Sequence, residues 1–87
     1  MDTFLKSLSM LPDGSKVSKV IMEGMRIGTD ADNHTDFATM NEQIINQLLQ
    51  NVDLLCKLVV NQAPQEMINN QCDIVARQTK TLDTLMR

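Results

Sequence analysis

A helical repeat of apolar residues between positions 44 and 60 constrains the fold of this chain more than any other feature. The stretch reads IINQLLQNVDLLCKLVV. Its β-branched residues recur every seven positions, with leucines between them, in the set Ile45, Leu48, Val52, Leu55 and Val59. β-Branched residues at heptad position a with leucine at d favour helices that associate in pairs. The repeat therefore predicts an amphipathic helix that buries this stripe against another helix.

A second stripe, shifted by one position, runs along the same segment. It consists of Ile44, Leu48, Asn51, Leu55 and Leu58. In this alternative Asn51 lies at the centre of the helix contact, as a buried polar residue that sets the register of the pair. If the first stripe is the buried one, Asn51 is a solvated residue instead. The pattern leaves both alternatives open.

Two helices are expected before the long one. The first is short and ends at Pro12, because proline cannot continue a helix. The second runs over residues 16–27, with Ser15 as its N-cap and Gly28 directly after its last turn. Residues 29–36 are small, polar and acidic, so they indicate a linker.

The C-terminal part of the chain predicts two further helical segments. The long helix begins between residues 35 and 40, and Asn61 can adopt the left-handed conformation that closes it. Pro64 either begins a new helix, which gives a helical hairpin, or kinks a continuous one, which gives a kinked coiled coil. The last segment carries its own apolar stripe, which includes Ile68, Val75 and Leu82.

The predicted fold is all-α and oligomeric, with three parts. Residues 1–28 form an N-terminal helical arm, residues 29–36 an acidic linker, and residues 37–87 a helical oligomerisation module. A chain of 87 residues is close to the size at which a single core is marginal, so self-association is expected. The expected interface consists of Ile45, Leu48, Val52, Leu55, Val59, Ile68, Val75 and Leu82.

Composition and charge argue against several classes of partner. The formal net charge is −3 and there is no Trp or Tyr, so neither a positive field nor a stacking platform for nucleic acid is expected. No run of apolar residues has the length of a membrane span. The first residues lack the features of a signal peptide. We therefore expect a cytoplasmic protein, or one in a particle assembled in the cytoplasm.

Residues that carry catalysis or bind metals are too few and too scattered to form a site. His34 is the only histidine, and Cys56 and Cys72 lie on or beside apolar stripes, where cysteine is usually a small buried hydrophobe. Structural zinc requires four ligands, usually in close pairs. The acidic segment lacks the glycine and the terminal bidentate acid of a calcium loop. We expect no enzyme activity, no cofactor, no metal and no small-molecule substrate.

These observations predict a structural or assembly protein that associates with itself and docks on a larger protein partner. Small subunits of viral or phage particles and of secretion filaments have this general organisation, which is an analogy of architecture alone. The alternative is a small regulatory binder or chaperone that presents an apolar helical face to a target protein.

Overall fold

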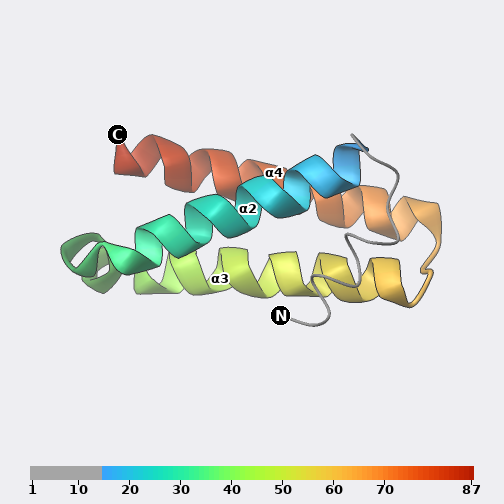
Figure 1. The fold of residues 1–87 in the computed structure, drawn as a ribbon, viewed down its shortest axis with the longest axis horizontal. Coiled ribbons are helices and arrows are strands. Elements are labelled where there is room, and N and C mark those ends of the chain that lie inside the picture. Colours follow the sequence, from blue (N-terminus) through green and yellow to red (C-terminus); the bar gives the residue numbers. More distant parts are fainter. Residues whose placement is uncertain (1–14) are drawn as a thin grey trace.

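The computed structural model describes residues 15–87, which form three packed α-helices. In chain order they are α2 (Lys16–Asn33), α3 (Thr35–Val60) and α4 (Gln65–Met86). Each helix contacts both others, and α3 runs in the opposite direction to α2 and α4 (Figure 1). The prediction of an all-α fold is therefore confirmed for this part of the chain. The short helix expected before Pro12 lies outside the described residues.

Helix α2 is longer than the sequence predicts. Its N-cap is Ser15, whose side chain accepts a hydrogen bond from the Ser18 N–H at 3.2 Å, as expected. The predicted end at Ile27 is wrong, because the helix continues through Gly28 to Asn33. Ala31, in the segment expected to be a linker, is buried against the core. This tertiary contact stabilises a helix that the polar local sequence would not support alone.

The predicted linker over residues 29–36 is helical except at His34. His34 has an extended backbone (φ −92°, ψ 95°) and separates α2 from α3, which begins at Thr35. Asn41 interrupts the early part of α3 with a non-helical φ of −125° and ψ of 23°. Its side-chain amide donates to the Phe37 carbonyl at 3.2 Å, and such insertion into the helical hydrogen-bond ladder is a known cause of kinks. The long helix, whose start the sequence places between residues 35 and 40, therefore begins at Thr35 and is kinked at Asn41.

Residues 61–64 connect α3 to α4. Gln62, and not Asn61 as expected, has the positive φ of 54°, while Asn61 has φ −83°. Pro64 immediately precedes the first residue of α4, and its carbonyl accepts from the N–H groups of Met67 and Ile68. Proline is tolerated here because the first helical N–H groups need no partner within the helix.

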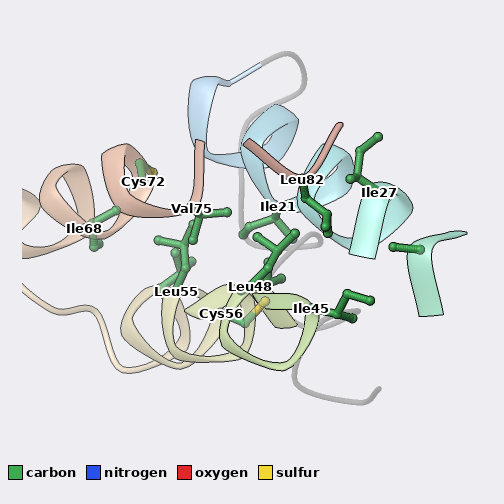
Figure 2. Packing of buried hydrophobic residues seen from close by; sticks show 13 residues of the cluster. Ile21, Ile27, Ile45, Leu48, Leu55, Cys56, Ile68, Cys72, Val75 and Leu82 are labelled. Atoms are coloured by element: carbon green, nitrogen blue, oxygen red, sulfur yellow. The ribbon is translucent and has the colours of Figure 1, made fainter. Parts of the chain in front are cut away.

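The core is aliphatic and lies between the three helices. Figure 2 shows Ile21, Leu48 and Val75, one from each helix, in this layer, and all three are fully buried. The cluster consists of Ile21, Ile27, Ala31, Ile45, Leu48, Val52, Leu55, Cys56, Val59, Ile68, Cys72, Val75 and Leu82. Both cysteines belong to it and form no disulfide. Within residues 15–87, no buried side-chain nitrogen or oxygen lacks a hydrogen-bond partner.

Two glycines bring α2 close to the other helices. A Cβ atom at Gly24 would lie 2.8 Å from Val52 Cγ2 and 3.1 Å from Val75 Cγ1. At Gly28 it would lie 2.6 Å from Leu49 Cδ2. Together with Ala31, these residues form a row of small side chains on the buried side of α2. Gly24 and Gly28 are therefore packing positions, and Gly28 does not end the helix as the sequence predicts.

Candidate functional site

The predicted interface residues all lie in the core of the single chain. Ile45, Leu48, Val52, Leu55, Val59, Ile68, Val75 and Leu82 are each at most 8% exposed. The first five belong to α3 and the others to α4, and all join the cluster that α2 covers. The heptad stripe is thus buried against helices of the same chain. The surface that the folded chain exposes is formed by other residues.

The groups that were considered for catalysis are dispersed or buried. The His34 ring lies 3.7 Å from the Asp30 carboxylate and is well exposed, at the junction of α2 and α3. Burial raises the pKa of the Cys72 thiol, so its reactive thiolate form is disfavoured. In the described part of the chain, no three His, Cys, Asp or Glu side chains are grouped as metal ligands would be.

An uncharged surface lies along α3 and α4, on the flank of each helix that borders the other. We call it the α3–α4 face. On α3 it includes Met40, Ile44, Gln47, Asn51, Leu54 and Leu58, and on α4 it includes Met67, Ile74, Gln78, Thr81 and Leu85. On α3 these positions recur at spacings of three and four, and on α4 at spacings of seven, four and three, so each set forms one row along its helix. Five of the six exposed large hydrophobic residues in the described chain belong to this face.

A network of amide side chains lies at the middle of the face and joins the two helices. The Asn51 Nδ2 atom donates to Gln78 Oε1 at 3.0 Å. Gln71 Nε2 donates to the Asn51 carbonyl at 2.9 Å and to Asn51 Oδ1 at 3.0 Å. Gln71 is only 6% exposed, whereas Asn51 and Gln78 are half-buried. The residues of the first stripe are thus the buried ones, and Asn51 is half-buried at the α3–α4 contact, neither solvated nor fully buried as the two sequence alternatives have it.

None of the positions of the α3–α4 face carries a charged side chain. Lys57 on α3 and Arg77 on α4 are at its margins by helical position, and Asp36 lies one turn before Met40 at the start of α3. Lys57 pairs with Asp53 at 2.8 Å along its own helix. Hydrogen bonding to Asp53 raises the pKa of Lys57, so this marginal lysine stays charged. The face is consequently a strip of apolar and amide side chains bordered by charge.

A second surface feature is an open groove of about 830 Å³ between α2 and α4. We call it the α2–α4 groove. Its lining includes Val20, Met22 and Ala76, with Lys19, Glu23, Arg26, Lys80 and Asp83 among its charged residues. Arg26 pairs with Glu23 at 2.7 Å, and this contact raises the pKa of the Arg26 guanidinium. Within residues 15–87, Lys19 and Lys80 form no ion pair, so the groove has two cations open to acidic groups.

Sequence reasoning missed both surfaces because it assigned the heptad stripe to association. A signal for the α3–α4 face was nevertheless present. In Met40, Gln47 and Leu54, and again in Met67, Ile74 and Thr81, uncharged residues recur every seven positions beside the buried stripes. An amphipathic surface helix usually carries charge at such positions.

Comparison of the chain with family models, with curated proteins and with solved structures finds no match in any of the three. The apolar length of each helix in residues 15–87 is too short for a membrane span.

Proposed function

We propose that this chain is a non-enzymatic structural or assembly protein that associates with itself and docks on a larger protein partner. The observation that carries the proposal is the uncharged α3–α4 face beside a core that is already closed. Interfaces are depleted of charged residues at their centre, because burying an unpaired charge costs far more than burying an amide. Met40, at 84% exposed, and Leu54, at 45%, are apolar side chains that an interface would cover.

Docking on the larger partner is assigned to the N-terminal end of the chain. The sequence expectation placed this role in an arm over residues 1–28. Because α2 is part of the bundle, we assign docking on the larger partner to the rest of that arm, residues 1–14. The cytoplasm, or a particle assembled there, is the compartment that this proposal implies.

The second candidate function is a small helical binder or chaperone, which the α2–α4 groove favours. An amphipathic helix of a target protein fits such a groove with its apolar side on Val20, Met22 and Ala76. Acidic residues at the edge of that helix would then pair with Lys19 and Lys80. Ion pairs of this kind contribute more to specificity and association rate than to affinity.

Size-exclusion chromatography with light scattering, over a range of concentrations of the full chain, separates the two functions. The assembly function predicts a molar mass that rises above that of one 9.8 kDa chain as concentration increases. A folded monomer up to high micromolar concentration argues against self-association and favours the binder. Circular dichroism on the same samples establishes that the chain is folded in either case.

A further inference from the structure

We propose that the α3–α4 face is covered by the same face of a second copy of this chain, in a twofold-symmetric dimer. This inference rests on the proposed function, since it names the surface and the partner through which self-association occurs. The dimer packs two helices of one copy on two helices of the other. Its centre is the amide network of Asn51, Gln71 and Gln78 in each copy.

The chemistry of the face favours its own copy over a charged partner. In a twofold interface a residue at the axis meets itself, so a charge there would be repelled by its counterpart. Amide side chains carry both donors and acceptors, and each can therefore bond to an identical group. Two copies, each of formal charge −3, can approach through this face because their charges lie outside it.

The apolar residues of the face are arranged in a way that such a dimer can use. Leu54 and Ile74 flank the amide network, one on each helix, because they lie three residues from Asn51 and four from Gln78. Met40 and Leu85 lie toward one end of the antiparallel pair, and Met67 lies toward the other. A twofold axis that crosses the helices near Asn51 brings each apolar end of one copy onto the opposite end of the second.

The dimensions are adequate for a stable interface. The Cα envelope of the molecule measures 38 × 23 × 21 Å. One of its long faces is therefore of the order of the roughly 800 Å² that each partner contributes to a standard-size interface. Chains of this size often gain stability by oligomerisation.

Paired charge variants at Ile74 test the dimer. Ile74 is 41% exposed, so a charge there leaves the core of the single chain intact. We expect Ile74→Glu and Ile74→Lys each to weaken self-association at least tenfold in sedimentation equilibrium, because like charges then face each other across the axis. Mixing the two variants in equal amounts should restore a dimer that contains one chain of each. Met22→Glu, at a position 56% exposed in the α2–α4 groove, is the matched control and should associate like the unmodified chain.

The outcomes separate this inference from the function on which it rests. Unchanged association of both Ile74 variants, or weakening by Met22→Glu alone, overturns the α3–α4 dimer and leaves self-association through another surface. Failure of the mixture to recover contradicts the twofold geometry. If the unmodified chain is monomeric at all concentrations, both the α3–α4 dimer and the assembly function are wrong. Circular dichroism of each variant establishes that its helices are formed, and Ile74→Gln, which adds no charge, should retain the dimer.

Discussion

At the scale of single residues, close packing decides the roles of Gly24 and Gly28 in α2. Alanine is favoured over glycine inside a helix by about 1 kcal/mol, so local preference alone predicts that alanine would stabilise both positions. The side chains that an added Cβ atom would meet differ between the two positions, however. The contact at Gly24 is with Val52, a buried residue whose branched side chain has one strongly preferred rotamer in a helix. The contact at Gly28 is with the end of Leu49, which is only partly buried and can move.

We therefore expect Gly24→Ala to destabilise the bundle and Gly28→Ala to be close to neutral. Overpacking a core typically costs about 1 to 3 kcal/mol, which outweighs the gain in helix propensity at Gly24. At Gly28 the cost of displacing the end of Leu49 and the gain in helix propensity are similar in size. Urea unfolding followed by circular dichroism measures both. A Gly24→Ala variant as stable as the unmodified chain would mean that α2 lies further from Val52 and Val75 than described.

The buried thiol of Cys72 gives a prediction for alkaline pH. Its pKa is raised by burial, so the folded chain keeps this proton to a higher pH than the unfolded chain does. The unfolded state then binds fewer protons, and stability should decrease as the pH rises above about 8.5, the usual value for cysteine. Thermal unfolding between pH 7 and pH 10 measures this loss. Cys72→Ala should unfold more readily at pH 7 but lose less stability with rising pH. An equal pH dependence in both chains would contradict the assignment.

At the scale of elements, the connection between α3 and α4 depends on a strained residue. Gln62 has a φ of 54°, a conformation that costs a side-chain-bearing residue about 1 to 2 kcal/mol. Local hydrogen bonds hold it: the Gln62 N–H donates to Val59 and the Ala63 N–H donates to Leu58. These bonds satisfy carbonyl groups at the end of α3, in the manner of helix C-terminal motifs. Pro64 then allows α4 to begin directly.

Replacement of this residue by glycine should stabilise the protein. We expect Gln62→Gly to add about 0.5 to 1 kcal/mol to the free energy of unfolding, since glycine adopts positive φ without strain but loses more entropy on folding. Asn61→Gly is the matched control, because Asn61 has negative φ, and it should be neutral or destabilising. Thermal unfolding of both variants decides the matter. Stabilisation by Asn61→Gly alone would place the left-handed residue one position earlier, as the sequence predicts.

At the scale of the whole molecule, α2 provides one of the three walls of the core. Ile21 and Ala31 are fully buried, and Ile27 is only 3% exposed. Lys16 of α2 also lies 3.6 Å from Asp73 of α4, although an exposed pair of this kind contributes little. Removing α2 would uncover the same stripe of α3 and α4 that the sequence assigns to an interface between chains. Whether residues 37–87 fold independently therefore depends on how much apolar burial they lose when α2 is absent.

We expect a chain that lacks residues 1–34 to lose cooperative unfolding. Its two remaining helices would expose the apolar side of the core, and pairs of helices this small are marginal in water. A chain that lacks only residues 1–14 is the control and should retain a cooperative transition in urea, because it keeps all of α2. Cooperative unfolding of the shorter chain at the same midpoint would instead support an independent module over residues 37–87.

The helical class of the fold, the N-cap at Ser15 and the buried stripes of α3 and α4 follow from the amino-acid sequence without knowledge of the packing. These features depend on the spacing of apolar residues and on local hydrogen bonding, and both can be inferred from one amino-acid sequence. The helices that cover those stripes are known from the packed structure alone, in which α2 lies over α3 and α4. Heptad periodicity indicates that a helix is buried but does not say whether its partner belongs to the same chain. The continuation of α2 through Gly28 and the central place of Asn51 likewise depend on contacts between residues distant in sequence, where close packing outweighs local preference.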